Sequence, residues 1–428
     1  MDFTFALSQG LFSSADIDTG TRFLLKVLSQ RWDARLSEGT EGSRRVLPRT
    51  VLDAGCGVGV LGICAARALG AAAAPGLDGG LGLRVRAQDR DELARAFTEY
   101  NARRNGVPVD PQSNAVLSAY TEPLLAGPDD ARWDLILSNI PAKTGEPVLL
   151  DFIPRSAGLL SKEGTVMVVA VNTLAGLLRS RIKELALPLL QDESGKEHTV
   201  LVYGGAEEVY PKNNPDDFLR QWPCYLRCSG DFELEGIGYH IDAIHGAAGF
   251  DNPGGAVKAA ARLTGHMGAK ISARSNAKAI LVHEPDQGHF PVWLLRYLER
   301  AFPGTVPDRL VLSGRNMLAL LAARHNLGGA AVTVPAVDIL LSRDALLAAS
   351  GRPYGAVFLF PDPVPRTSRL GAYWDGLEAL LEPGGIAVTA LSSSEAERFD
   401  REKPRSFLRL GDHKRHGFRA LGYEKRQS

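Results

Sequence analysis

The chain has 428 residues, of which 45% are hydrophobic and 23% are charged, as is usual for a globular protein. This length is enough for two or three domains. Its 49 basic residues are balanced by 49 acidic residues, so the net charge identifies no nucleic-acid or membrane partner.

The four cysteines and nine histidines form no disulfide framework and no metal-binding pattern. The first residues lack the basic and apolar regions of a signal peptide, and no apolar run reaches the roughly 18 residues of a membrane span. We therefore expect a cytoplasmic protein with no metal site and no membrane contact.

Short apolar segments alternate with helical segments along the first half of the chain. Strands are predicted over residues 49–54, 83–88, 133–138 and 164–171. Helices are predicted over residues 60–69 and 90–105, and a third helix is expected to end within residues 154–160. This alternation predicts a parallel, doubly wound α/β sheet.

A glycine-rich loop follows the first predicted strand. Asp53 lies near the end of that strand, and Gly55, Gly57 and Gly59 follow at alternate positions. Glycines allow a tight turn and a close approach of the backbone to a ligand, and the next helix points its amino end at that ligand. Asp89, well beyond Gly59, ends the second strand, where a carboxylate can accept both hydroxyls of a ribose.

The same loop also fits the dinucleotide pattern Gly57-x-Gly59-x-x-Gly62, which by itself is a weak signal. Asp53 discriminates between the two interpretations. A carboxylate beside the loop would repel a pyrophosphate but favours the cationic methionine end of S-adenosylmethionine (SAM). The loop therefore favours SAM over NAD or FAD, and a degenerate fold without ligand stays as the other alternative.

The second half repeats the plan of the first half. Adding 229 to the numbers 51–69 gives 280–298, adding 225 places Arg84–Asn101 on Arg309–Asn326, and adding 221 places Leu159–Gly164 on Leu380–Gly385. The slow, ordered drift of the shift is what changes in loop length produce, so we predict an internal duplication. A polar segment, 211–217, is the expected linker region.

Three motifs of the first half resemble the small-domain class I methyltransferases. These are DAGCGVG, the helix DRDELARAFTEYNARRNG that Asp89 opens, and DLILSNIPAKTG. Bacterial ribosomal-RNA guanine-N2 methyltransferases are the most similar group, and they carry tandem domains, one active and one degenerate. Their segment F-S-x4-D-x-G-[ST]-x2-L-L is matched here by Phe12-Ser13, Asp18, Gly20-Thr21 and Leu24-Leu25.

The resemblance implies that Asp18, Gly20 and Thr21 lie near the methionine end of SAM. It also implies that Asn139 and Pro141 form the catalytic segment, with Asn139 holding the target amine beside the cofactor. This chain departs from the family pattern [DN]-P-P-[FYW], because it has Asn139-Ile140-Pro141-Ala142 and so lacks the aromatic ring that stacks on a base. Phe152 and Phe12 are candidate substitutes. An acid for the adenine amino group is also missing near residues 118–120.

The second copy lacks the corresponding chemistry. Asp53 corresponds to Val282, Gly55 and Gly57 correspond to Glu284 and Asp286, and Asp89 corresponds to Gly314. The segment facing Asn139-Ile140-Pro141 is Phe360-Pro361-Asp362, in which Asp362 keeps one polar group. We therefore expect no SAM binding in the second copy, which would serve the first structurally or by docking substrate.

The predicted architecture is two tandem Rossmann-like class I methyltransferase domains, an internal duplication with a degenerate second copy. The predicted boundaries are 1–208 for the catalytic domain, 209–236 for a linker region and 237–428 for the degenerate domain. The expected reaction is SAM-dependent methylation of an exocyclic amine of guanine in ribosomal RNA. Two alternatives stay open, which are methyl transfer to a protein amide or small molecule, and binding of SAM or RNA without turnover.

The carboxyl-terminal segment, residues 400–428, carries nine basic side chains against four acids. Such an end can hold phosphates, and a solvated surface is the competing interpretation. The oligomeric state leaves no signal in the sequence.

Overall fold

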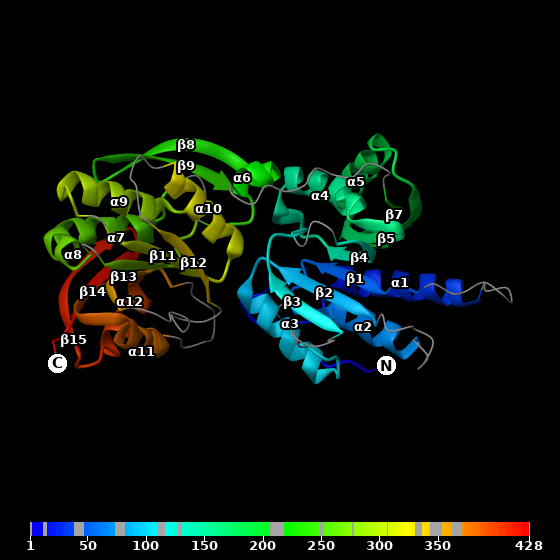
Figure 1. Cartoon of the computed structure of the whole chain (residues 1–428), viewed down its shortest axis with the longest axis horizontal. Helices are drawn as coiled ribbons and strands as arrows, with labels where there is room; N and C mark the ends of the chain where they lie inside the picture. The colour runs from blue at the N-terminus through cyan, green and yellow to red at the C-terminus, as the bar shows by residue number, and fades with distance from the viewer. Residues whose placement is uncertain are drawn as a thin grey trace. The chain divides into compact units, whose positions relative to one another are not determined.

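The computed structural model describes residues 2–11, 15–37, 47–72, 82–109, 116–126, 131–205, 218–248, 252–275, 278–305, 307–329, 336–342, 353–361 and 370–427. The chain divides into two compact units, Met1–Asn213 and Asn214–Ser428. Each unit contains one seven-stranded sheet with helices packed against it (Figure 1).

The sheet of the first unit has the strand order β3-β2-β1-β4-β5-β7-β6. The order reverses between β1 and β4, and all neighbours are parallel except β7, which is antiparallel to β5 and β6. The strands are β1 (Thr50–Ala54), β2 (Arg84–Asp89), β3 (Leu117–Thr121), β4 (Trp133–Asn139), β5 (Leu160–Val171), β6 (Leu189–Ser194) and β7 (His198–Gly204). Ligands of open α/β sheets bind outside the carboxyl ends of the strands at such a reversal point.

Helices cover both faces of this sheet. The helices are α1 (Thr19–Ser37), α2 (Val60–Ala72), α3 (Glu92–Arg104), the short η1 (Ala142–Thr144), α4 (Glu146–Gly158) and α5 (Asn172–Glu184). Buried side chains of α1, α2 and α3 share one apolar cluster with Val51, Val85 and Val169 of the strands. In Figure 1, α4 and α5 lie on the opposite side of the sheet from α1 and α2.

The second unit has the equivalent order β12-β11-β10-β13-β14-β16-β15, together with a two-stranded hairpin of β8 and β9. Its strands are β8 (Leu226–Leu234), β9 (Ile237–Ile244), β10 (Ala279–His283), β11 (Arg309–Gly314), β12 (Val337–Leu341), β13 (Tyr354–Leu359), β14 (Leu381–Ser392), β15 (Phe407–Arg415) and β16 (Phe418–Lys425). Its helices are α6 (Phe218–Gln221), η2 (Pro223–Tyr225), α7 (Gly255–His266), α8 (Gly268–Ser275), α9 (His289–Ala301), α10 (Met317–Gly328), α11 (Leu370–Leu380) and α12 (Ser393–Arg401).

The predicted duplication is confirmed. Adding 229 to the bounds of β1 and α2 gives those of β10 and α9, adding 225 to β2 gives β11, and adding 221 to β5 gives β14. The changes of shift fall in the connections between these elements, as insertions and deletions in surface loops require.

A buried asparagine makes the same contacts in both copies. The Asn101 side chain accepts from the backbone N–H of Ala6 and donates to the carbonyls of Ala6 and Val58. Asn326, the equivalent residue of the second copy, accepts from the N–H of Asp242 and donates to the carbonyls of Asp242 and Gln287. Because both side chains are buried, each amide satisfies backbone groups that would otherwise lack partners.

Three sequence predictions need adjustment. The sheet predicted to be parallel is mixed, because β7 is antiparallel to β5 and β6. The strand predicted over residues 164–171 begins at Leu160. Within the expected linker region 209–236, residues 218–236 contain α6, η2 and β8, because β8 pairs along its length with β9. The remaining linker residues, 209–217, lie outside the described residues, as do Phe12, Ser13 and Asp362.

Within the described parts of the chain, no helix is long and apolar enough to cross a membrane. Those same residues contain no group of three or more His, Cys, Asp or Glu side chains arranged to hold a metal ion.

Candidate cofactor and acceptor site

The glycine loop after β1 has a left-handed backbone at three positions. The φ angles of Gly55, Gly57 and Gly59 are 77°, 55° and 86°. The loop is anchored on β2, because the N–H groups of Gly55 and Cys56 both donate to the carbonyl of Gln88. A Cβ atom on Gly57 would meet no atom within 4 Å, so the backbone there borders open space in which a ligand can approach it closely.

Asp89 links the end of β2 to this loop. One carboxylate oxygen accepts from the N–H of Gly57 at 3.0 Å, and the other accepts from the N–H of Asp91 at 3.0 Å. Burial raises the pKa of this carboxyl group, and the backbone N–H donors oppose the shift. Each oxygen retains capacity to accept a further hydrogen bond, as the hydroxyls of a ribose would require.

Asp53 is fully buried under the loop. Its Oδ2 accepts from the N–H of Gly62 at 2.7 Å, and its Oδ1 is buried with no hydrogen-bond partner among the described residues. The pKa of Asp53 is raised to about 7. Burial is the largest cause, the Gly62 N–H opposes the shift, and the charge of Asp89 adds to it. A buried carboxylate oxygen without a partner is stabilised by a cation and destabilised by an anion, so these residues fit SAM rather than a pyrophosphate.

Asn139 ends β4 and contacts the amino end of α1. Its Nδ2 donates to Oδ2 of Asp18 at 2.6 Å and to Oγ1 of Thr21 at 2.9 Å. Asp18 also caps α1, because the same Oδ2 accepts from the N–H of Thr21 at 3.1 Å. The structure therefore brings Asp18 and Thr21 together with Asn139, although Asn139 is far from them in the sequence.

The orientation of the Asn139 amide follows from its partners. A carboxylate only accepts hydrogen bonds, so the NH2 group must face Asp18 and the carbonyl oxygen must face away. Within the described residues this Oδ1 receives no hydrogen bond. It is therefore an acceptor with a fixed position at the carboxyl end of β4.

The segment after Asn139 offers no aromatic ring. Ile140 is buried and donates its N–H to the carbonyl of Val169, Pro141 precedes η1, and Ala142 is exposed. Phe152, a candidate for the missing ring, is only 2% exposed and belongs to the packed face of α4, so it cannot stack on a ligand.

The sequence shows no acid near residues 118–120 for the adenine amino group, but an acid does follow the end of β3. Glu122 supplies an acid one residue beyond the strand, but it forms an ion pair with Arg86 at 2.5 Å. Arg86 also lies over the ring of Tyr120, 3.7 Å from its centroid. Gln88 donates to the carbonyls of Pro123 and Leu124, which fixes the loop beside Gly55.

One residue of the site was missed by sequence reasoning. His198 begins β7, and a Cβ atom on Gly20 would lie 2.9 Å from its Cδ2 and also 2.9 Å from Oδ2 of Asp18. No local motif marks this histidine. Only the pairing of β5 with β7 brings it to the amino end of α1.

The loop of the second copy keeps the backbone shape without the glycines. Glu284 and Asp286 both have φ of 52°, and Gly288 has φ of 103°. The Glu284 carboxylate accepts from the N–H of Arg315, and a Cβ atom on Gly314 would lie 2.9 Å from its Oε2. The side chain of Glu284 therefore occupies the space beside the position that corresponds to Asp89.

The other two positions are apolar in the second copy. Val282, at the position of Asp53, is fully buried in the core. Phe360, at the position of Asn139, packs on Phe290 with ring centroids 4.9 Å apart. At these described positions the second copy thus retains the fold but has apolar side chains where the first copy has Asp53 and Asn139.

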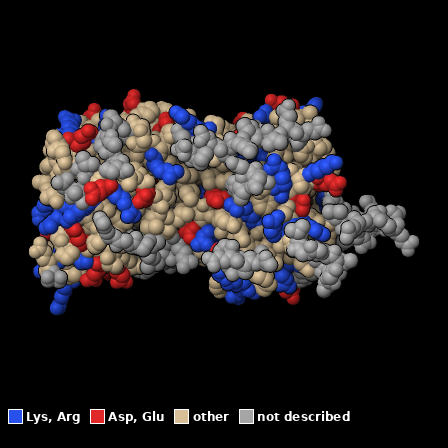
Figure 2. All heavy atoms as spheres, in the orientation of Figure 1, with Lys and Arg blue, Asp and Glu red and all other residues tan. Residues whose placement is uncertain are grey.

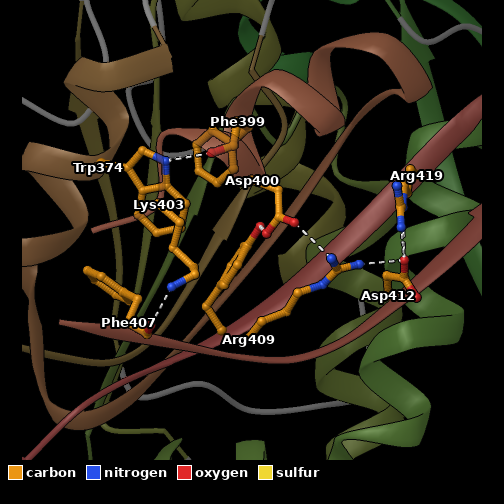
Figure 3. Close-up of polar contacts among 9 residues, drawn as sticks. Trp374, Phe399, Asp400, Lys403, Phe407, Arg409, Asp412 and Arg419 are labelled. Carbon is orange, nitrogen blue, oxygen red and sulfur yellow. Dashed lines mark hydrogen bonds and ion pairs between the residues drawn. The ribbon is translucent and has the colours of Figure 1, made fainter. Parts of the chain in front are cut away.

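The basic carboxyl-terminal segment is largely engaged within its own unit. Arg409 pairs with Asp400 and Asp412, and Arg419 also pairs with Asp412 (Figure 3). Three more basic side chains are also bound internally. Arg415 pairs with Glu235, Lys403 donates to the carbonyl of Phe407, and Lys425 donates to the carbonyls of Glu378 and Leu381.

Four basic side chains of this segment remain exposed and have no ion pair among the described residues. They are Arg401, Arg405, Lys414 and Arg426. On the face drawn in Figure 2, basic and acidic side chains are interspersed and the described residues form no extended basic patch. The expected phosphate-binding role of this segment thus rests on these four side chains.

A family model described as Methyltransferase small domain matches residues 2–185. The matched residues lie within the first unit, which contains the glycine loop, Asp89 and Asn139. The first unit therefore carries a methyltransferase small domain. The members of this family are SAM-dependent methyltransferases.

The tandem arrangement has a counterpart among solved structures. The 16S rRNA N2 G1207 methyltransferase (RsmC) of T. Thermophilus, solved in complex with AdoMet and guanosine, is similar over 98% of this chain and 95% of that chain, with 14% identity and a TM-score of 0.56. A ribosomal protein L11 methylase from Lactobacillus delbrueckii subsp. bulgaricus is similar over 46% of this chain and 82% of that chain, with 23% identity and a TM-score of 0.34. No curated protein is significantly similar in sequence.

We expect SAM binding to require Gly57 and Asp89. Replacement Gly57→Val places a branched side chain where the backbone must approach the ligand, and Asp89→Ala removes the acceptor for the ribose hydroxyls. Loss of hydrogen bonds to a charged acceptor, about 1.5–3 kcal/mol each, weakens binding roughly 10-fold or more. Isothermal titration with SAM measures the effect.

A matched control for backbone strain is Gly106→Val, because Gly106 has φ of 70° and equally open surroundings. This variant should bind SAM like the wild type. If SAM affinity survives both Gly57→Val and Asp89→Ala, the assignment of the loop is wrong.

Asp53 should make stability depend on pH. Because its pKa in the folded protein is about 7 rather than 3.8, the folded state binds this proton more tightly than the unfolded chain. The free energy of unfolding therefore falls as pH rises from about 4 to about 7, by about 2–3 kcal/mol between pH 5 and pH 8.

The Asp53→Asn variant carries no charge at this position and should lose less stability over the same interval. Denaturant unfolding at about pH 5 and pH 8, without SAM, compares the two proteins. Identical pH profiles would show that Asp53 is not the buried acid that titrates.

Proposed function

We propose that the first unit transfers a methyl group from SAM to an exocyclic amine of guanine in ribosomal RNA. The observation that carries this proposal is the fixed amide of Asn139, whose Nδ2 is held by Asp18 and Thr21. Its Oδ1 is left to accept an N–H of the target amine.

The residues around the glycine loop would hold the cofactor. Asp53 and Asp18 supply negative charge near the methionine end, Gly20 and Thr21 line the same end, and Gly55, Gly57, Gly59 and Asp89 border the nucleoside end. When bound, SAM supplies an electrophilic methyl group on a sulfonium centre. The buried, unpartnered Oδ1 of Asp53 is the feature of this chain that fits its positive charge.

Asn139 would act by orientation. An amine that donates one hydrogen to a fixed Oδ1 loses rotational freedom, so its lone pair is held in one direction. The Asp18 carboxylate prevents the amide from turning its NH2 group toward the acceptor, because that orientation would bring two oxygens together. Pro141 restricts the backbone that follows, and Asn139 needs neither a covalent intermediate nor a change of charge.

The choice of a guanine amine in RNA has two supports. The T. Thermophilus enzyme, similar over nearly the whole of both chains, was solved with guanosine. The amine-holding asparagine stands at the carboxyl end of β4, beside the loop. A protein amide or a small molecule is the second candidate substrate, since Ala142 stands where the family pattern has an aromatic ring.

The second unit is proposed to bind no SAM. Close backbone approach is obstructed by Glu284 and Asp286, and Gly314 has no side chain to accept from a ribose. We assign residues 1–208 to catalysis and 237–428 to a structural or RNA-docking role. The four exposed basic side chains of the carboxyl-terminal segment are the docking candidates, and a cytoplasmic location follows from an RNA substrate of this kind.

Replacement Asn139→Ala should reduce methyl transfer to ribosomal RNA by roughly 10²-fold or more, on the scale of losing a positioned catalytic group. SAM affinity should stay near the wild-type value and serves as the internal control. Transfer of labelled methyl groups from SAM to total RNA, to protein and to small molecules measures both the loss and the substrate class. Unchanged turnover would show that Asn139 has only a structural role in the turn. Label found only in protein or small molecules would exclude RNA as the substrate.

One chain should bind one SAM molecule. Calorimetric titration of the full chain should give a stoichiometry of one. The first copy has the acceptor Asp89 at the end of β2 and glycines in its loop, whereas the equivalent strand of the second copy, β11, ends at Gly314. Gly57→Val should abolish this binding, whereas Asp286→Ala, at the equivalent position of the second copy, should leave it unchanged. Two equivalent sites per chain would contradict the asymmetry.

A further inference from the structure

His198 lies beside the groups that orient Asn139. A Cβ atom on Gly20 would be 2.9 Å from Oδ2 of Asp18 and 3.1 Å from Nε2 of His198, so both of those atoms border the same small space. The same Oδ2 accepts from Asn139 at 2.6 Å, which places the imidazole and the amide around one carboxylate. Position 20 has no room for a side chain, because Asp18 and His198 occupy the space that its Cβ atom would need.

Strand register places His198 on the same face of the sheet as Asn139. Asn139 is paired with Val169, and His198 is paired with Val171. Side chains two positions apart on β5 point to the same face, so the strand partners of Val169 and Val171 share that face. This is the face that α1 covers, at the end where Asp18 begins the helix.

The turn that carries His198 is held in place by Asn172. The N–H of Asn172 donates to the carbonyl of Glu197, and its side chain donates to the carbonyls of Gly195 and Lys196 and accepts from Thr199. The imidazole is half-buried and makes no hydrogen bond of its own within the described residues. This turn thus presents a polar ring whose nitrogen atoms have no hydrogen-bond partner in the part of the chain that the structure describes.

The second copy provides an internal comparison. Phe418 begins β16 and pairs with Ser392, just as His198 begins β7 and pairs with Val171. A Cβ atom on Gly255 would lie 2.5 Å from Cδ2 of Phe418. A ring over a helix-start glycine is therefore common to both copies, so ring packing belongs to the fold.

The nitrogen atoms of the ring distinguish the two copies. The copy with Asp53 and Asn139 has an imidazole at this position, and the copy with Val282 and Phe360 in their place has a phenyl ring. A neutral imidazole can donate one hydrogen bond and accept one. An aromatic ring is absent from the segment after Asn139, so a planar acceptor needs another contact to fix its orientation.

We propose that His198 binds the acceptor substrate, by a hydrogen bond from its imidazole to the ring edge of the base whose amine Asn139 holds. This inference rests on the proposed function. Two contacts, one to the amine and one to the ring edge, fix a planar base against rotation about the first contact. Asn172 acts as a positioning residue for His198.

The test compares His198→Phe with the wild type and with Asn139→Ala on the same ribosomal RNA. His198→Phe keeps the ring packing that the second copy shows, so the variant should fold with an unchanged unfolding midpoint. The KM for RNA should rise roughly 3- to 10-fold, the value of one neutral hydrogen bond, and the Kd for SAM should stay the same. His198→Gln, which retains a donor, should recover part of the loss.

The matched control is Phe418→His, which places an imidazole at the equivalent position of the second unit and should change neither constant. A wild-type KM for His198→Phe, while Asn139→Ala has lost turnover, would overturn the role of His198 and leave the proposed function intact. A raised Kd for SAM would assign His198 to the cofactor and also overturn the proposal. Absence of RNA methylation by the wild type would refute the proposed function, and the present inference with it.

Discussion

The left-handed loop between β1 and α2 is the constraint on which the site of the first unit depends. Its conformation sends the N–H of Gly57 to Asp89 and brings the N–H of Gly62 to Asp53, so one loop orients both acids. A non-glycine residue in this conformation costs about 1–2 kcal/mol. The second copy bears that cost at Glu284 and Asp286, because its sheet and its helix α9 still require the same turn.

The two copies separate the requirements of the fold from those of the chemistry. Both copies have the same strand order and a buried asparagine, Asn101 or Asn326, that binds backbone groups. Both also have a ring packed over the glycine at the start of a helix. The acids, the amide of Asn139 and the imidazole of His198 are present only in the first. Side chains that satisfy buried backbone groups stabilise the fold of either copy, whereas the side chains of the candidate site are not needed for the fold.

The first unit also places a group that opposes its stability at the centre of its site. Asp53 is fully buried and leaves one oxygen without a partner among the described residues, which favours the protonated form in the absence of ligand. A cationic ligand reverses this preference, because its charge stabilises the carboxylate that burial destabilises. The burial that costs the folded protein free energy at Asp53 is thus the same feature that fits the site to a positively charged ligand.

The sequence by itself determined β1, β2, β4 and most of β5, the glycine loop, the acids at two strand ends and the duplication with its drifting shift. These features depend on local hydrophobic patterns and on the stereochemistry of glycine, which act over a few residues. Tertiary structure decided which side chains meet. Phe152 proved to be core, Arg409 and Arg419 proved to be paired with acids, and His198 reached Asp18 only through the pairing of β5 with β7. Such contacts depend on strand register and helix packing, which join residues far apart in the chain and leave no pattern in a short segment.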